Sequence, residues 1–191
     1  MKIKKMQQVR IIGGQWRGKK LPVPEIDGLR PTPDRIRETL FNWLMTDCPG
    51  ASVLDCFAGS GALGFEALSR EAKQLTMIEN NSRAWRNLER QAEHFQDDRI
   101  TLLFGDAIDL IAQLKRQYSL VFIDPPYALP RLRQQVLESL IEHRRLLDGA
   151  KIYLEWSAAE QFELPDSSLF WLKQKIAGRV NYAIAEWRSS G

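Results

Sequence analysis

The chain has 191 residues, of which 44% are hydrophobic and 27% charged, and it carries a formal net charge of +3. This composition excludes general disorder, and the length is sufficient for one full hydrophobic core. Two cysteines, Cys48 and Cys56, are too few for a disulfide framework and form no C-x-x-C pattern. No apolar run is long enough to cross a membrane, and no apolar segment follows the basic start, so we expect a cytoplasmic chain with no membrane partner.

Positive charge is concentrated at the N-terminus. Residues 1–20 contain seven basic side chains and no acidic one, which leaves the rest of the chain net negative by four. The segment 10–18 reads Arg-Ile-Ile-Gly-Gly-Gln-Trp-Arg-Gly and predicts a short β-hairpin around the paired glycines rather than a solvated tail. We interpret residues 1–28 as an extension that binds nucleic acid through phosphate contacts and one stacking ring. The predicted contacts are Arg10, Trp16, Arg17, Lys19 and Lys20.

The second unit, residues 29–191, begins with an extended stretch and a helix. Prolines in 29–33 fix φ and restrict their neighbours, so this stretch is predicted to be extended. Thr32 is placed to cap a helix over 33–46, where apolar residues recur at helical spacing. Pro49 and Gly50 end this helix.

Strand and helix patterns then alternate along the chain. The predicted strands are 52–55, 74–79, 100–104, 120–123 and 152–154, and the predicted helices are 61–70, 82–95, 107–116 and 130–147. Apolar strands that alternate with helices are typical of a parallel sheet covered on both faces. Two final strand patterns, 169–176 and 180–187, predict an antiparallel hairpin at one edge. The fold class is therefore α/β, with a doubly wound and mostly parallel sheet.

Each predicted parallel strand delivers an acidic residue to the carboxyl edge of the sheet, where ligands bind in open parallel sheets. An acidic residue beside a helix N-terminus can also serve only to stabilise the helix dipole, so local context must separate the two roles. The five acidic residues are Asp55, Glu79, Asp106, Asp124 and Glu155.

A glycine-rich loop follows the first of these strands. Residues 55–64 contain G-x-G-x-x-G at the start of a predicted helix, a pattern that fits several adenosine-containing cofactors. Glu79 suits ribose hydroxyls, and Asp106 can accept a hydrogen bond from an adenine amino group. A buried Asp55 repels a pyrophosphate but favours the sulfonium and amino group of S-adenosylmethionine (SAM). The predicted cofactor contacts are Asp55, Phe57, Gly59, Gly61, Glu79, Asn80, Asp106 and Ala107.

The most specific motif is Asp-Pro-Pro-Tyr at 124–127, where another strand ends. Two prolines after a strand are also ordinary turn residues. An acid, a stiff bend and an aromatic ring beside a cofactor loop favour a catalytic site over a plain turn. The predicted catalytic residues are Asp124, Pro125 and Tyr127.

These motifs resemble those of a known family. Residues 55–64 resemble motif I of the class I SAM-dependent methyltransferases. Residues 124–127 resemble motif IV of the enzymes that methylate amino groups of nucleic-acid bases or glutamine amides. Residues 10–18 and 29–38 are similar to segments of the RsmD family, guanine-N2 methyltransferases of 16S ribosomal RNA. The resemblance covers nearly the whole chain.

The resemblance implies a seven-stranded sheet with a reversed final strand. It implies SAM as the cofactor and a guanine of 16S rRNA, on the small ribosomal subunit or its assembly intermediate, as the substrate. It also implies that Arg30 and Thr32 lie near the methionine end of SAM, although helix capping explains Thr32 as well. The carboxylate of Asp124 and the carbonyl of Pro125 would accept the two N–H bonds of the guanine amine. Tyr127 would stack on the flipped base.

Several alternatives remain open from the sequence. The same site fits methylation of adenine N6 in DNA or of a glutamine amide. A nicotinamide-dependent oxidoreductase fits the glycine loop, although Asp55 disfavours it. An RNA-binding assembly factor could keep the fold as a scaffold. We expect a monomer that holds no metal.

Overall fold

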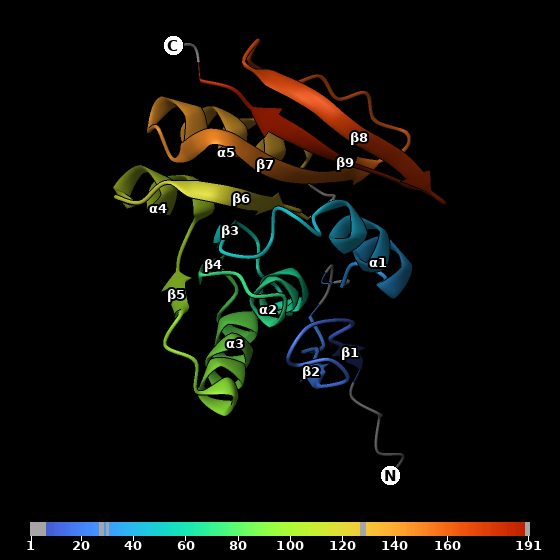
Figure 1. Ribbon diagram of the computed structural model, residues 1–191, viewed down its shortest axis with the longest axis vertical. Coiled ribbons are helices and arrows are strands. Elements are labelled where there is room, and N and C mark those ends of the chain that lie inside the picture. Colours follow the sequence, from blue (N-terminus) through green and yellow to red (C-terminus); the bar gives the residue numbers. More distant parts are fainter. Residues whose placement is uncertain (1–6, 27–28, 30, 127–128, 190–191) are drawn as a thin grey trace.

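A seven-stranded sheet forms the centre of the computed structural model, which describes residues 7–26, 29, 31–126 and 129–189 (Figure 1). The strand order is β5-β4-β3-β6-β7-β9-β8, and all neighbours from β5 to β7 are parallel. β9 is antiparallel to both β7 and β8, so the C-terminal hairpin closes one edge. The strands are β3 (Ser52–Asp55), β4 (Gln74–Glu79), β5 (Ile100–Phe104), β6 (Tyr118–Ile123), β7 (Leu146–Ser157), β8 (Leu169–Ala177) and β9 (Val180–Trp187).

Helices cover both faces of this sheet, which confirms the predicted fold class. Apolar side chains of the strands alternate between two core clusters, one beneath α1, α2 and α3 and the other beneath α4 and α5. All eight residues of α2 are buried, because this helix lies between the sheet and the N-terminal hairpin. The helices are α1 (Asp34–Trp43), α2 (Ala62–Ser69), α3 (Ser82–Phe95), α4 (Ala107–Gln113) and α5 (Pro130–Glu142).

The chain order of the strands places a topological switch point between β3 and β6. From β3 the chain builds outward through β4 and β5, then returns to place β6 on the other side of β3. Neighbouring crossovers therefore leave the sheet in opposite directions at this point. In open α/β sheets such a switch point opens a crevice at the carboxyl ends of the strands. The glycine loop after β3 and the motif after β6 both begin there.

The two largest boundary errors adjoin each other, at the end of the helix predicted over 130–147 and at the start of the strand predicted over 152–154. α5 ends at Glu142, and Arg144 then adopts a left-handed φ of +55°, which reverses the chain before β7 begins at Leu146. The predicted cap of the first helix is also wrong. Pro33 occupies the N-cap position without a side-chain hydrogen bond, and Thr32 lies one residue earlier. Helical periodicity alone predicts neither the end of α5 nor the N-cap of α1, since each depends on the backbone conformation of a single residue.

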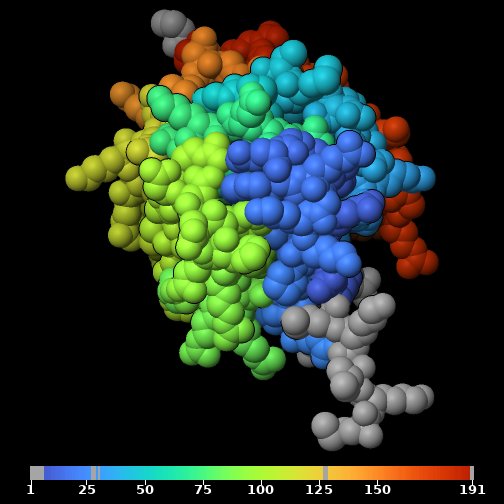
Figure 2. All heavy atoms as spheres, turned by 60° about the horizontal axis from the view of Figure 1, so that its bottom comes forward, coloured from blue at the N-terminus to red at the C-terminus, as the bar shows by residue number. Residues whose placement is uncertain are grey.

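The N-terminal extension forms a hairpin with other bounds than predicted, because most of the segment 10–18 is its connecting loop. This hairpin packs against the rest of the protein. β1 (Gln8–Arg10) pairs antiparallel with β2 (Lys20–Pro22), and the loop between them reaches α2. Figure 2 shows the blue N-terminal segment alongside the green segment that contains α3. Ile11, Trp16 and Leu21 belong to the same core cluster as α2 and α3. The proposed extension therefore shares a core with the body of the protein.

Candidate active site

Three acidic residues come together at the carboxyl ends of adjacent strands. Asp55 ends β3, Asp124 follows β6, and Glu155 lies near the end of β7. Their strands are hydrogen-bonded neighbours in the order β3-β6-β7. Asp55 is 3% and Glu155 4% exposed, whereas Asp124 keeps part of its surface open to solvent. Asp124 is therefore the least buried residue of the three.

Burial and mutual repulsion alter the ionisation of these acids. Loss of solvation raises the pKa of Asp55 from 3.8 to about 7, opposed by a backbone hydrogen bond from Phe57 and reinforced by the charge of Glu79. The pKa of Asp124 is also raised well above its usual value, first by burial and then by Glu155 and Asp55. A hydrogen bond from Thr32 acts in the opposite direction. The cluster therefore attracts either protons or a cationic ligand.

A buried arginine supports the far side of this cluster. The Nε of Arg133 in α5 donates to the backbone carbonyl of Glu155 at 3.0 Å, and its Nη1 forms a 3.0 Å ion pair with Glu160. Its guanidinium lies 4.9 Å from the ring centroid of Phe162. The positive charge of Arg133 lowers the pKa of Asp124, so it offsets part of the repulsion among the carboxylates.

The glycine loop holds Glu79 in a fixed orientation. Its carboxylate accepts hydrogen bonds from the backbone N–H of Gly59 at 2.8 Å and of Asn81 at 2.7 Å. Gly61 has a φ of +79°, and a Cβ there would lie 2.5 Å from the ring of Phe65. Glycine is therefore required at 61 both by the backbone and by packing.

The remaining predicted cofactor residues differ in their surroundings. Asp106 is exposed and caps α4, where its Oδ1 accepts from Ile108 N at 2.8 Å. Ala107 is buried, Asn80 is exposed and Phe57 is half-buried. For Asp106, capping is therefore present whether or not the residue also contacts a ligand.

The residues at this edge fit SAM. The loop from Asp55 to Gly64 contains no lysine or arginine that would neutralise a phosphate, and the nearest charged groups are carboxylates. The carboxylate oxygens of Glu79 each accept one backbone N–H and keep capacity for ribose hydroxyls, and Asp55 provides negative charge for a sulfonium or amino group. A cofactor with positive charge and no phosphate matches this donor set better than a dinucleotide does.

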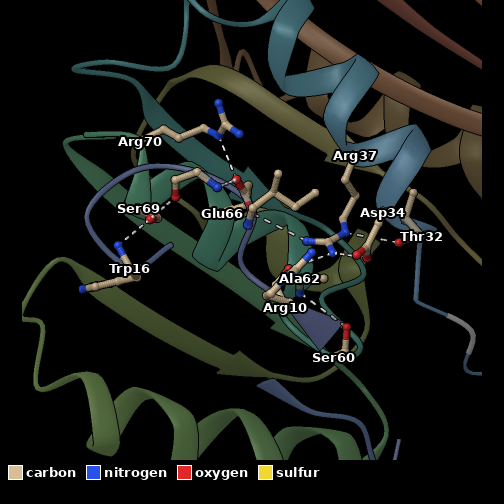
Figure 3. Close-up of polar contacts among 12 residues, drawn as sticks. Arg10, Trp16, Thr32, Asp34, Arg37, Ser60, Ala62, Glu66, Ser69 and Arg70 are labelled. Atoms are coloured by element: carbon tan, nitrogen blue, oxygen red, sulfur yellow. Dashed lines mark hydrogen bonds and ion pairs between the residues drawn. The ribbon is translucent and has the colours of Figure 1, made fainter. Parts of the chain in front are cut away.

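Thr32 contacts the candidate catalytic carboxylate of Asp124. Figure 3 shows Thr32 beside Arg37. Its side chain is 6% exposed, and Oγ1 donates a long hydrogen bond of 3.4 Å to Oδ2 of Asp124. Arg37, whose side chain is fully buried, donates from Nε to the carbonyl of Thr32 at 3.2 Å. The sequence associates Thr32 with a helix cap or the cofactor, and no motif identified Arg37 as part of the site. The available signal was a charged residue on the apolar face of helix 33–46.

Arg37 and Glu66 form the centre of a larger buried network. Nη1 of Arg37 lies 3.6 Å from Oε2 of Glu66, and neither side chain is exposed. Glu66 also accepts from the backbone N–H groups of Ile12 at 2.7 Å and Gly13 at 2.8 Å. Arg70 adds an ion pair of 2.8 Å to the same carboxylate. The network therefore ties the hairpin loop to α1 and α2.

The predicted nucleic-acid contacts divide into exposed and buried residues. The four basic ones are exposed, whereas the ring of Trp16 is 9% exposed and stacks on Phe95 at 4.1 Å between centroids. The expectation that Trp16 stacks on a base is therefore wrong, because Phe95 already covers its face. The exposed basic residues of the hairpin are Arg10, Arg17, Lys19 and Lys20.

Two predicted site residues, Arg30 and Tyr127, lie outside the described residues. Within the described ranges, no group of three His, Cys, Asp or Glu side chains is arranged to hold a metal ion. No helix in the described part of the chain is long and apolar enough to span a membrane.

Comparison with known proteins gives a consistent result. The model of the family described as conserved hypothetical protein 95 matches residues 9–186. Ribosomal RNA small subunit methyltransferase D of Escherichia coli is 40% identical over 184 residues, which cover 96% of this chain and 92% of that protein. The structure of a putative methyltransferase from Escherichia coli has a TM-score of 0.89 at 38% identity, and the match covers 96% of this chain and 100% of that chain. A putative methyltransferase complexed with SAH shares the fold at 15% identity, with a TM-score of 0.70 over 97% of this chain and 57% of that chain.

Proposed function

Because this chain belongs to the family of conserved hypothetical protein 95, the RsmD family of SAM-dependent methyltransferases, we propose that it methylates the exocyclic N2 amine of a guanine in 16S rRNA. The substrate is the small ribosomal subunit or its assembly intermediate, in the cytoplasm. The observation that carries this proposal is the partly exposed Asp124 beside the glycine loop, at the sheet's switch point. The name of the relative in Escherichia coli supports ribosomal RNA as the substrate class.

Asp55, Gly59 and Glu79 are proposed to hold SAM, a role supported by their fit and by the SAH bound to a protein of the same fold. SAM supplies an electrophilic methyl group carried on a sulfonium. The guanine amine is a poor nucleophile, because its lone pair is delocalised into the ring. An acceptor for each N–H bond would hold the nitrogen in a tetrahedral geometry with its lone pair toward the methyl group.

Asp124 and Pro125 are proposed to provide those two acceptors. Prolines at 125 and 126 have no backbone N–H that would compete for the carboxylate. Methylation makes an amine proton acidic, and one proton must leave the nitrogen. Asp124 is placed to take this proton, since burial and its acidic neighbours raise its pKa. Tyr127 remains proposed as the ring that stacks on the flipped base.

The exposed basic residues of the hairpin are proposed to bind phosphates of the RNA. Neutralisation of about four phosphates predicts a roughly 50-fold loss of affinity between 50 and 200 mM salt. Replacing Arg17 and Lys20 by alanine should reduce the slope of log affinity against log salt by about 1.4. Fluorescence anisotropy with a labelled 16S rRNA fragment measures both quantities.

The matched control for this charge removal is the pair Lys173 and Lys175, exposed on β8 at the other edge of the sheet. Their replacement by alanine removes the same charge and should leave the slope within about 0.3 of wild type. Equal slopes for both double variants would mean that the hairpin contributes only to the overall charge of the protein and forms no local contact with phosphates.

Transfer of labelled methyl groups tests the proposed reaction directly. The protein is incubated with methyl-labelled SAM and, separately, with unmethylated small subunits, naked 16S rRNA or duplex DNA, and each product is digested to nucleosides. We expect N2-methylguanosine from the small subunits. N6-methyladenine from DNA would show that the substrate is DNA adenine, and labelled glutamine would show that it is a protein amide. Either result would leave the proposed active-site residues unchanged. No transfer to any acceptor would favour the assembly-factor alternative.

A further inference from the structure

A continuous series of polar contacts joins Asp124 to the basic hairpin through Thr32 and Arg37. Figure 3 shows the part of this series that runs from Thr32 through Arg37 to Arg10. Thr32 donates to Asp124, and the carbonyl of Thr32 accepts from Nε of Arg37. Nη2 of Arg37 donates to the carbonyl of Arg10 at 2.9 Å and to Asp34 at 2.6 Å. Arg10 is the last residue of β1, so this series of contacts ends in the hairpin itself.

Arg37 is well suited to couple the position of the hairpin to that of Thr32. Its guanidinium is planar, permanently charged and fully buried, so its hydrogen bonds fix the relative positions of the groups that it contacts. The two backbone carbonyls that it binds, of Arg10 and Thr32, belong to segments 22 residues apart in the sequence. A shift of the hairpin therefore alters the segment that carries Thr32, unless Arg37 loses a buried hydrogen bond.

We propose that Thr32 is a positioning residue for Asp124, and that Arg37 couples its position to the docking of the hairpin. This inference rests on the proposed role of Asp124 in methyl transfer. The hydroxyl of Thr32 holds one carboxylate oxygen, Oδ2, and leaves Oδ1 for the substrate amine. The 3.4 Å length is consistent with such a role, since hydrogen bonds of catalytic groups commonly tighten when the substrate is bound.

The charge environment of Asp124 determines the direction of the expected effect. Glu155 from β7 and Asp55 from β3 raise the pKa of Asp124, whereas Arg133 from α5 and the hydroxyl of Thr32 lower it. Removing the hydroxyl takes away a group that stabilises only the ionised carboxylate. The pKa of Asp124 must then rise, and a smaller fraction of the carboxylate is ionised at any given pH near neutrality.

Valine at position 32 tests this role, because Thr32→Val keeps the branched shape and removes the donor. We expect kcat for methyl transfer to fall about 10- to 100-fold, with KM for SAM within about twofold of wild type. The acidic limb of the kcat profile should move to higher pH, and Thr32→Ser should restore both rate and profile. An unshifted limb, or an equal loss in Thr32→Ser, would show that Thr32 acts only through packing.

A second measurement does not depend on turnover. Carboxyl carbons of ¹³C-labelled aspartate report ionisation by NMR, and Asp124→Asn identifies the signal of Asp124. In Thr32→Val the titration of Asp124 should move up by roughly one pH unit. If the wild type methylates none of the tested acceptors but this shift is seen, the proposed function fails while the coupling stands. If methylation is seen without the shift, the coupling fails alone.

Alanine substitutions at two glycines of the hairpin loop test the proposed coupling through Arg37. Gly14 has a φ of +75°, and a Cβ there would lie 1.8 Å from the carbonyl oxygen of Ser69, so Gly14→Ala displaces the loop from α2. Gly18 has a φ of +85° with open space around it, so Gly18→Ala introduces similar backbone strain without a clash. Gly14→Ala should raise the pKa of Asp124 and lower kcat, whereas Gly18→Ala should change neither.

Amide hydrogen exchange verifies that the loop has moved. The N–H of Gln15 donates to the carbonyl of Ser69 at 2.8 Å, and that of Trp16 to its Oγ at 2.9 Å. Both amides should lose protection in Gly14→Ala and keep it in Gly18→Ala. Lost protection with an unchanged titration of Asp124 would overturn the coupling through Arg37.

Discussion

The Asp124→Asn variant is expected to lose methyl transfer by about 10²–10⁴-fold while it remains folded and binds SAM. Asparagine keeps the shape of the side chain, but its amide nitrogen cannot accept an N–H bond or the proton that the amine releases. Transfer of labelled methyl groups to small subunits measures the rate, and calorimetry measures the affinity for SAM. Residual activity within tenfold of wild type would contradict the proposed mechanism.

The same substitution should not destabilise the protein at alkaline pH. Asp124 is repelled by Glu155 and Asp55, and its raised pKa means that the folded state holds a proton more tightly than the unfolded state does. This residue therefore costs stability as pH rises above its unfolded pKa, and asparagine removes that cost. Urea unfolding at pH 8 should give a free energy of unfolding equal to or above that of wild type. Asp98→Asn, at an exposed position of the turn between α3 and β5, is the control and should change neither activity nor stability.

Loss of Glu66 is expected to have the largest effect on stability. Glu66→Ala leaves the buried charge of Arg37 without its acidic partner in α2, and it deprives Ile12 and Gly13 of a hydrogen-bond acceptor. Removing one member of a buried ion pair typically costs about 3–5 kcal/mol. Urea denaturation should show a loss of this size, and the exposed Glu93→Ala in α3 should show none.

The double variant Glu66→Leu with Arg37→Met separates lost charge balance from lost packing. Replacing both members of a buried pair by apolar residues of similar volume is often close to neutral, so most of the stability should return. The proposed coupling to Asp124 should not return, because methionine cannot donate to the carbonyl of Thr32. A double variant as unstable as Glu66→Ala would mean that hydrogen bonds to the loop, rather than the buried charge, dominate this site.

The parallel sheet was predictable because the strands β3, β4 and β5 are short apolar runs with an acidic residue at or just beyond their ends. Their bounds agree with the prediction. β3 and β4 are almost entirely buried, whereas no residue of β5 is. β7 was underestimated, because its first residues continue the apolar pattern of α5. The reversal of chain direction at Arg144 depends on a left-handed backbone conformation, which arginine rarely adopts and which the sequence therefore does not predict.

The candidate site was predictable where chemistry follows directly from a strand end, as at Asp55 and Asp124. Contacts between segments far apart in the sequence were not predictable, because the hydrophobic periodicity of a segment does not indicate which other segment it will contact. Trp16 is an aromatic residue among basic ones, a pattern typical of nucleic-acid contacts, yet tertiary packing places its ring against Phe95. Thr32 has the sequence position of a helix cap, yet its hydroxyl faces Asp124. In both cases the side chain found a partner more than 70 residues away.

The docking of the hairpin on α2 also constrains the order in which the protein can mature during synthesis. The hairpin emerges from the ribosome first, but the partners of its loop, Glu66 and Ser69, lie 53 to 56 residues later in the chain. Until they emerge, the apolar side chains of Ile11 and Leu21 have no core to enter. The basic surface therefore acquires its shape only after the glycine loop has been made. A nascent chain cannot present this basic surface in its ordered form before its glycine loop exists.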